Sequence, residues 1–268
     1  MVPAGAADAG QDLVAVVSKD LLAAAYDATA AAYAGHTDRL VYRYLAQPLV
    51  RALRGLPGPV LDVASGAGAL GRSLPGAVAL DLSMGQLAHN PLPSRVRADA
   101  ERLPFRDGAF AAACCAFGVN HFPDPLAALV EMARVAPLVG LLTWERPEAP
   151  YAPKQAVQDA IARHAPAPRS SAGRLIDALG ERVGSAEALR SLLAGAGLRA
   201  TAEVVTVVVP WPGAAAFTEY RLANAGAAGL LDGPALERVR RDAAAAIARL
   251  PPASLDWRPR LVLALGRR

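Results

Sequence analysis

Short, mostly apolar runs alternate with helical or turn-like segments through the middle of the chain. Apolar residues fill these runs continuously instead of occupying every second position, which is typical of strands that are buried on both faces. The runs cover residues 59–64, 77–82, 95–98, 110–117 and 139–144. Helices are expected to start between them at Ser83 and at Asp124, where Pro125 suits a first helical position. The alternation predicts a parallel sheet with helices on both sides.

The N-terminal part has helical periodicity instead. Apolar residues recur at helical spacing over residues 18–35 and again over 37–56. Ser18 is a suitable N-cap for the first helix. Pro48 should break or kink the second, because proline removes a helix hydrogen bond. We therefore expect residues 1–57 to form an N-terminal helical cap.

The alternation of strands and helices stops after Trp144 and resumes only further along the chain. Residues 58–145 are expected to form the ligand-binding core. Residues 146–197 carry helical periodicity and are long enough to form an insertion, which we expect to be a helical lid. Residues 198–268 should complete the core sheet and carry inserted helices. The expected elements are helices at 154–164, 173–179, 185–196, 214–224 and 234–250, and strands at 198–209 and 260–265.

Composition excludes several classes of protein. The chain is 53% hydrophobic and 19% charged, against about 45–50% and 25% in an average soluble domain, so it is expected to fold. No apolar run approaches the roughly 18 residues of a membrane span. No basic segment precedes an apolar one, as it would in a secretory signal. Cys114 and Cys115 lie together in an apolar run and are interpreted as core residues in a reducing compartment. We expect a cytoplasmic protein with no membrane partner.

The charge is mildly basic, with a formal net charge of +4 and a pI near 9.4. A basic pI is a feature of many nucleic-acid-binding proteins. Here, however, the arginines are scattered along the chain, and no segment resembles an added nucleic-acid module. We therefore expect no nucleic-acid partner.

A glycine loop follows the first apolar run, with Gly66, Gly68 and Gly71 spaced as G-x-G-x-x-G. Glycines there permit a tight turn and the close approach of a ligand. A dinucleotide site would need an acidic residue about 20 positions beyond the loop, whereas Asp81 comes only 15 after Gly66. Asp62, inside the strand, has no use at a pyrophosphate but suits a cationic ligand. The flanking residues therefore favour a cationic ligand over a dinucleotide.

The run from Asp62 to Gly68 resembles motif I of the class I S-adenosylmethionine-dependent methyltransferases, with Ala64 replacing the first glycine. The similarity is greatest to the small-molecule branch, which includes ubiquinone- and menaquinone-biosynthesis-type and natural-product enzymes. Further landmarks of the family follow in order at 78–83, 97–105, 116–125 and 131–135. The resemblance implies an α/β fold of the Rossmann-like type. Its doubly wound, seven-stranded, mostly parallel sheet would have one antiparallel strand near its end, N-terminal helices and a helical lid.

The same resemblance implies S-adenosylmethionine as the cofactor. Asp62, Asp81 and Asp99 lie near successive strand ends, where they would accept hydrogen bonds from its ammonium group, ribose hydroxyls and adenine amine. Helix capping would explain the same aspartates. Tyr26 lies in a run that resembles the N-terminal helix of this branch and would bind the methionine carboxylate, with helix packing as the alternative. The other predicted cofactor contacts are Ala64, Gly66, Gly68, Leu82, Ala100, Ala116 and Phe117.

His121 is the candidate catalytic residue. It follows the fourth strand, beside the expected methyl group, and histidine is a suitable general base at neutral pH. A polar loop residue or a residue that shapes the substrate site is the alternative, because methyl transfer gains mainly from proximity and orientation. An apolar, partly aromatic acceptor site is predicted from Asn120, Phe122, Trp144, Trp211 and Tyr220, although core packing explains each aromatic residue as well. No spacing of ligand residues suggests a metal site.

Together these features predict methyl transfer to a small, largely apolar or aromatic metabolite at an oxygen, nitrogen or carbon atom. Specialised-metabolite biosynthesis is the expected setting, and a monomer or homodimer the expected state. Three alternatives stay open. They are an enzyme of the same fold that catalyses cyclisation or rearrangement, an RNA methyltransferase with basic residues beside its site, and a non-catalytic module that only binds S-adenosylmethionine.

Overall fold

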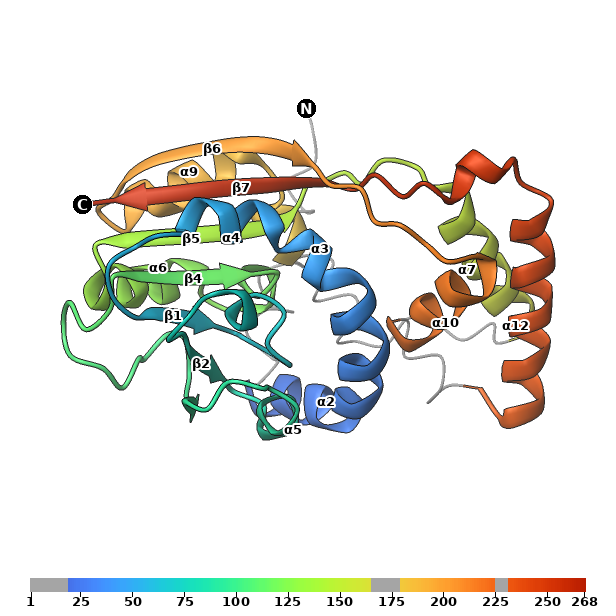
Figure 1. The fold of residues 1–268 in the computed structure, drawn as a ribbon, viewed down its shortest axis with the longest axis horizontal. Helices are drawn as coiled ribbons and strands as arrows, with labels where there is room; N and C mark the ends of the chain where they lie inside the picture. Colours follow the sequence, from blue (N-terminus) through green and yellow to red (C-terminus); the bar gives the residue numbers. More distant parts are fainter. Residues whose placement is uncertain (1–18, 165–178, 225–230) are drawn as a thin grey trace, which may run out of the picture.

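The computed structural model describes residues 19–164, 179–224 and 231–268 (Figure 1). A seven-stranded sheet runs through it in the order β3-β2-β1-β4-β5-β7-β6. Strands β1 to β5 pair in parallel, whereas β7 pairs antiparallel with both β5 and β6. The strands are Val60–Val63, Val78–Asp81, Arg95–Arg97, Ala112–Ala116, Leu138–Trp144, Arg199–Thr206 and Arg260–Arg267, from β1 to β7. The predicted doubly wound α/β sheet with one antiparallel strand is confirmed.

The sheet separates two hydrophobic cores. Every residue of β1 is buried, and so are the first four residues of β4. Cys114 packs into one core and Cys115 into the other, because successive residues of a strand point to opposite faces. Both cysteines are free and buried, as predicted for core residues. Burial on both faces explains the continuous apolar runs in the sequence.

Helices cover both faces of the sheet. Helix α6 (Pro125–Val135) begins at Asp124, whose side chain accepts a hydrogen bond from the backbone N–H of Ala127. Helix α5 (Met84–Ala88) begins at Ser83, which accepts from the backbone N–H of Gln86. Both predicted N-caps are confirmed. Helix α4 (Gln47–Leu53) packs on the opposite face, against Gly140 of β5.

The N-terminal helices differ from the prediction in one respect. Helix α2 (Lys19–Ala32) passes without a break into a π-helix, η1 (Tyr33–Tyr42), and then into α3 (Arg43–Leu45). The predicted interruption near residue 36 is therefore wrong. Pro48 lies in the first turn of α4, where its missing N–H costs no helix hydrogen bond. Ser18, the predicted N-cap, lies outside the described residues.

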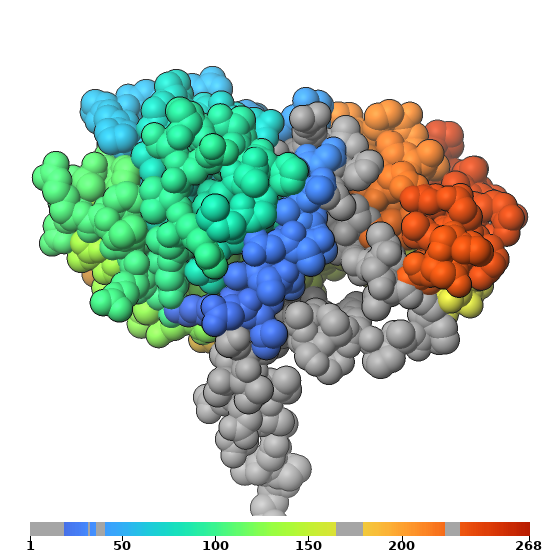
Figure 2. All heavy atoms as spheres, turned by 90° about the horizontal axis from the view of Figure 1, so that it is seen from below, coloured from blue at the N-terminus to red at the C-terminus, as the bar shows by residue number. Residues whose placement is uncertain are grey.

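Three helices form a separate layer beyond the ends of the strands, at the right of Figure 1. They are α7 (Ala152–His164), α10 (Ala214–Asn224) and α12 (Gly233–Ala248). Figure 2 shows the same division from below, with α2 lying between the core and this layer. The predicted helix at 173–179 falls almost wholly outside the described residues.

Helix α9 (Ala186–Gly195) belongs to the core instead of the lid. Leu189 and Leu193 on its buried face share one hydrophobic core with Leu198, and Gly266 of β7 leaves room for Leu193. Within the predicted lid of residues 146–197, this helix therefore packs with the core. The segment that joins β6 to β7 also carries the short helix η4 (Pro252–Leu255).

Candidate functional site

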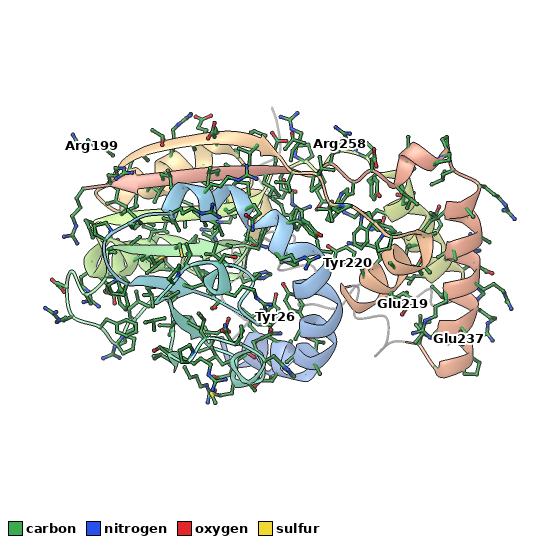
Figure 3. The ribbon with its side chains drawn as sticks, in the orientation of Figure 1. Tyr26, Arg199, Glu219, Tyr220, Glu237 and Arg258 are labelled. Carbon is green, nitrogen blue, oxygen red and sulfur yellow. The ribbon has the colours of Figure 1, made fainter. Side chains whose placement is uncertain are left out.

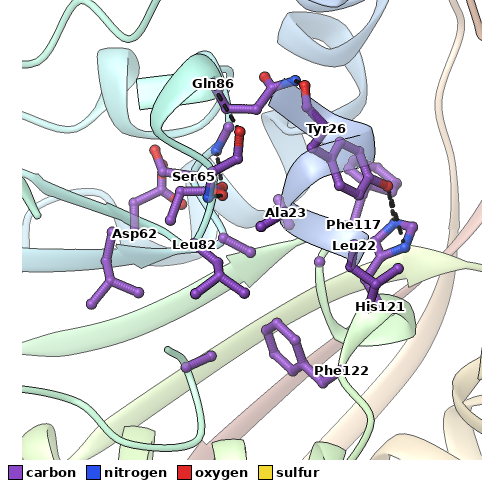
Figure 4. A pocket seen from close by; sticks show the side chains of 18 of the residues that line it. Leu22, Ala23, Tyr26, Asp62, Ser65, Leu82, Gln86, Phe117, His121 and Phe122 are labelled. Carbon is purple, nitrogen blue, oxygen red and sulfur yellow. Dashed lines mark hydrogen bonds between the residues drawn. The ribbon is translucent and has the colours of Figure 1, made fainter. Parts of the chain in front are cut away.

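A large pocket opens where β1, β2 and β4 end, under helix α2. It encloses about 1100 Å³ of empty space, including the solvent at its mouth. Open α/β sheets bind their ligands at this edge. Figure 4 shows the side chains that line it.

Asp62 stabilises the glycine loop through two hydrogen bonds. Its Oδ2 accepts hydrogen bonds from the Ser65 hydroxyl, at 2.8 Å, and from the Gly71 backbone N–H, at 3.0 Å. The side chain lies on the pocket wall but is only 1% exposed. Its carboxylate therefore stabilises the loop, a function that the sequence analysis did not assign to it.

Ala64 occupies the position of the first motif glycine and keeps a left-handed backbone, with φ of 54°. A non-glycine residue in that conformation costs about 1–2 kcal/mol. A Cβ on Gly118 would come within 2.5 Å of the Ala64 Cβ, so Gly118 provides the space that Ala64 needs. Phe117 also has a positive φ, of 62°. Strained residues of this kind concentrate at functional sites.

Gly68→Ala is expected to destabilise the loop. Gly68 has a φ of 89°, and a Cβ there would lie 2.9 Å from both Asn90 Oδ1 and Pro91 Cδ. Asn90 holds the loop by donating to the Gly66 carbonyl at 2.9 Å. We expect a loss of at least about 2 kcal/mol in the free energy of unfolding, together with weaker ligand binding.

Gly76→Ala is the matched control for that substitution, measured by denaturant unfolding. Gly76 has a similar φ of 72°, but a Cβ there meets nothing within 4 Å. It should therefore report backbone strain alone, of about 1 kcal/mol. Equal losses in the two variants would contradict the predicted clash at Gly68.

Asp81 connects the glycine loop to α5. Its Oδ2 accepts from the Gly66 backbone N–H at 2.8 Å, and its Oδ1 accepts from the Ser83 backbone N–H at 2.9 Å. Burial raises the pKa of Asp81, although these backbone hydrogen bonds act in the opposite direction. Each carboxylate oxygen can accept a second hydrogen bond, so Asp81 can hold the loop and a ligand hydroxyl together.

Asp99 lies further along the pocket wall and has a partner that the sequence analysis missed. Its Oδ2 lies 2.6 Å from the Lys19 ammonium, and its Oδ1 accepts from the Glu101 backbone N–H at 3.0 Å. Lys19 also forms an ion pair with Glu101. All three residues line the pocket.

One face of α2 forms the roof of the pocket. Lys19, Leu22, Ala23 and Tyr26 all line it, and their spacing of three, four and seven residues places them on one side of a helix. Asp27, on the adjoining side, accepts from the Gly85 backbone N–H at 2.7 Å and so ties α2 to α5. The helical periodicity was visible in the sequence, but it did not show which face covers a ligand.

Tyr26 and His121 meet at the other end of the pocket, as Figure 4 shows. The Tyr26 hydroxyl lies 3.2 Å from Nε2 and 3.3 Å from Nδ1 of His121. Burial lowers the pKa of His121 to about 4 and raises the pKa of Tyr26. Both side chains are therefore uncharged at neutral pH.

The π-helix brings two more phenols to this end. Tyr33 and Tyr42 both line the pocket, with ring centroids 5.8 Å apart. An α-helix turns about 100° per residue, so residues nine apart would lie on opposite faces. The wider π-helix makes it possible for both rings to reach the pocket. Tyr42 then meets the predicted contact Phe117 edge-on at 4.9 Å.

Most of the predicted site residues line this one pocket, but a few do not. Gly68 packs outside it against Asn90. Asn120 is buried, and its Oδ1 has no hydrogen-bond partner. The predicted residues that line the pocket are Tyr26, Asp62, Ala64, Gly66, Asp81, Leu82, Asp99, Ala100, Ala116, Phe117, His121 and Phe122.

Three predicted acceptor residues form an aromatic cluster behind the pocket instead. Trp144 packs on Trp257 at 5.8 Å and on Phe117 at 5.0 Å. Trp211 and Tyr220 pack together at 5.0 Å, and Figure 3 shows Tyr220 on the lid side of the molecule. Their function in acceptor binding stays a prediction, because aromatic residues in the sequence indicate packing as readily as binding.

The pocket wall is acidic at one end and has spare hydrogen-bonding capacity. Asp62, Asp81, Asp99 and Glu101 line it, whereas Lys19 is its one lysine or arginine among the residues that the structure describes. Gln86, a residue that the sequence analysis missed, is 2% exposed, and its Oε1 has no partner. These groups fit a cationic ligand with several donors, such as S-adenosylmethionine.

Comparison with known proteins agrees with this geometry. Residues 61–142, from β1 to β5, match the family described as a methyltransferase domain. The match covers about a third of the chain and supports an S-adenosylmethionine-dependent methyltransferase. The matched family implies S-adenosylmethionine as the cofactor.

The sequence relatives of the matched residues include demethylmenaquinone methyltransferases. The protein from Mycobacterium marinum is 43% identical over 100 residues, which cover 35% of this chain and 43% of that protein. The protein from Mycobacterium tuberculosis is 41% identical over the same length. The chain thus matches less than half the length of these curated relatives.

Solved structures share the fold over most of the chain, beyond the residues that match the family. A methyltransferase assigned to an antibiotic biosynthesis pathway of Anabaena variabilis has a TM-score of 0.58 and 16% identity, covering 83% of this chain and 98% of that one. The [4+2]-cyclase SpnF has a TM-score of 0.52 and 17% identity, covering 93% and 96%. At these identities the likeness shows the fold alone.

Two features that would indicate other kinds of site are absent from the described residues. No group of three or more histidine, cysteine, aspartate or glutamate residues there could hold a metal ion. None of the described helices combines the length and the apolar character that crossing a membrane requires.

Proposed function

We propose that this protein transfers a methyl group from S-adenosylmethionine to a small, uncharged, largely apolar or aromatic acceptor. One observation carries the proposal. A single pocket joins an acidic end, at Asp81 and Asp99, to an uncharged aromatic end, at Tyr26, His121 and Phe122. The first end suits a cationic cofactor, and the second suits a neutral ring.

The residues of the acidic end would hold the cofactor. When bound, S-adenosylmethionine supplies an electrophilic methyl group on a sulfonium cation. Asp81 would accept from the ribose hydroxyls and Asp99 from the adenine amine. Gly66 leaves its backbone open to close approach, since a Cβ there would meet only Gln86 Oε1, at 3.7 Å. Gln86 itself offers an unused acceptor for the ligand.

The residues of the aromatic end would orient the acceptor and take its proton. His121 is neutral at pH 7 because its pKa is about 4, so one ring nitrogen can accept a proton from an acceptor hydroxyl. Leu22, Phe117 and Phe122 line the same end and exclude water from it. Exclusion of water and fixed orientation provide much of the expected rate enhancement.

The class of acceptor can be tested with a matched pair of compounds. The curated relatives are named for a quinone substrate, so 1,4-dihydroxynaphthalene and its 2-carboxylate are suitable probes. The aromatic end offers no described cation to pair with a carboxylate. We expect the neutral diol to be methylated at least about tenfold faster, because burying an unpaired charge is costly. A preference for the carboxylate, measured by mass spectrometry of the product, would contradict the proposed acceptor class.

RNA is disfavoured as the acceptor. The RNA alternative predicts a basic cluster beside the site, but Lys19 on the described pocket wall is already paired with two carboxylates. Arg199 and Arg258 lie at opposite ends of the outer strands in Figure 3. The cytoplasmic location, the specialised-metabolite setting and the monomeric or homodimeric state are part of the proposal, and they rest on the sequence features described above.

A further inference from the structure

The ammonium group of Lys19 forms ion pairs with two carboxylates, Asp99 and Glu101, at the acidic end of the pocket. Lys19 Nζ lies 2.6 Å from Asp99 Oδ2 and also pairs with Glu101. The side chains of Lys19 and Asp99 are each 33% exposed and that of Glu101 is 16% exposed, so solvent screens these pairs only in part. Burial lowers the pKa of Lys19, but the hydrogen bonds to both carboxylates outweigh it and raise the pKa. The side chain is therefore a cation at neutral pH.

The two carboxylates are held in place by different parts of the core. Asp99 Oδ1 accepts from the Glu101 backbone N–H at 3.0 Å, which leaves Oδ2 for Lys19 or for a ligand. Glu101 Oε1 accepts from the Asp124 backbone N–H at 3.0 Å, at the start of α6. The Glu101 side chain therefore has a contact with the core that does not depend on Asp99.

We propose that Lys19 is a positioning residue that exchanges partners when the cofactor binds: a neutral N–H donor of the ligand takes Asp99 Oδ2, and Lys19 keeps Glu101 alone. This inference rests on the proposed function, because it takes the adenine amine as that donor. One ammonium between two carboxylates leaves one negative charge. The neutral N–H donor of the ligand then provides a hydrogen bond to Asp99 Oδ2, and the Lys19 ammonium stays paired with Glu101.

The exchange would affect helix α2, which forms the roof of the pocket. Lys19 is the first described residue of α2, and Tyr26, two turns later, meets His121. The Lys19–Glu101 pair would hold the start of α2 over the ligand, so that the adenine end stays covered after binding. Lys19 would thereby slow the release of the ligand while leaving its carboxylate contact free.

Dissociation of S-adenosylhomocysteine from the full-length protein, followed by stopped-flow fluorescence, tests this directly. Lys19→Met should release the ligand about two- to fivefold faster than wild type, the range expected for a partly exposed ion pair. Lys154→Met is the matched control, because Lys154 is the only other lysine of the chain and pairs with Glu148 in the lid. An unchanged rate in Lys19→Met would overturn the proposal.

Lysine acylation distinguishes partner exchange from simple stabilisation of α2. With acetic anhydride and mass spectrometry, Lys154 serves as the internal reference. Ligand binding should leave Lys19 protected in wild type, where Glu101 remains its partner. In Glu101→Gln the same ligand should increase the acylation of Lys19 several-fold, since no partner remains. No increase in that variant would overturn the exchange.

Failure of the proposed function has a different signature. If wild type does not bind S-adenosylhomocysteine at all, both proposals are wrong. If wild type binds it and Lys19→Met releases it at the wild-type rate, only the function of Lys19 is wrong.

Discussion

Asp81→Asn is expected to reduce the affinity for S-adenosylhomocysteine by two to three orders of magnitude. Asp81 accepts from the backbone N–H groups of Gly66 and Ser83 and is partly buried. An asparagine amide has one accepting oxygen, so one of these N–H groups would face an NH₂ donor instead. Hydrogen bonds to a charged group contribute about 1.5–3 kcal/mol each. Asp81→Asn would lose one hydrogen bond from a backbone N–H and weaken one hydrogen bond from the ligand. Together these losses account for the expected decrease in affinity.

Isothermal titration calorimetry measures this effect, and Asp107→Asn provides the control. Asp107 is also an aspartate, but its side chain is 80% exposed and pairs with Arg134 away from the pocket. Asp107→Asn should retain wild-type affinity. Near-ultraviolet circular dichroism would show whether Asp81→Asn keeps its fold. A folded Asp81→Asn variant within threefold of the wild-type affinity would contradict the predicted position of the ribose.

His121→Asn is expected to reduce turnover by about 10²- to 10⁴-fold, the usual contribution of general base catalysis. The affinity for S-adenosylhomocysteine should change little, because His121 lies at the aromatic end, away from Asp81 and Asp99. Turnover of wild type should be level between pH 6 and 8 and fall only towards the His121 pKa of about 4, below which the imidazole is protonated. A variant with wild-type turnover would show that no base is needed.

The same burial predicts a change in stability with pH. The unfolded chain binds a proton at His121 below about pH 6.5, whereas the folded protein does not until about pH 4. The stability that neutral His121 provides is therefore present above pH 6.5 and lost as the pH falls towards 4. The loss is about 3 kcal/mol. Urea unfolding at several pH values should show it in wild type and not in His121→Asn. Equal pH dependence in both would contradict the assignment.

Tyr26→Phe separates the two functions considered for Tyr26. It keeps the ring and removes the hydroxyl that lies 3.2 Å from His121 Nε2. Reduced turnover with normal S-adenosylhomocysteine affinity would indicate a function at His121. Reduced affinity would favour the carboxylate contact that the resemblance implies.

The sheet and its caps were predictable from the sequence for local reasons. Strands buried on both faces produce continuous apolar runs, and Ser83 and Asp124 satisfy backbone N–H groups that any helix start exposes. The glycine loop was found because it follows one apolar strand at a fixed spacing, and Asp81 was found because it ends the next strand.

The features that the sequence did not reveal depend on tertiary contacts. Lys19 and Gln86 belong to helices whose pocket-facing side is decided only when they pack. No sequence pattern distinguishes the π-helix that brings Tyr33 and Tyr42 together from an ordinary helix. Helix α9 has the same amphipathic pattern whether it covers a sheet or a lid. Trp144 shows the same ambiguity between packing and binding.

Transfer of a trideuterated methyl group tests the central claim most directly. Wild-type protein would be incubated with S-adenosylmethionine labelled in its methyl group and with neutral hydroxylated aromatic compounds, and all products analysed by mass spectrometry. We expect S-adenosylhomocysteine to form only when an acceptor is present, in equal amount to an acceptor that carries the intact labelled methyl group. Tight binding of S-adenosylmethionine with no S-adenosylhomocysteine formed, or a rearranged acceptor without the label, would contradict methyl transfer.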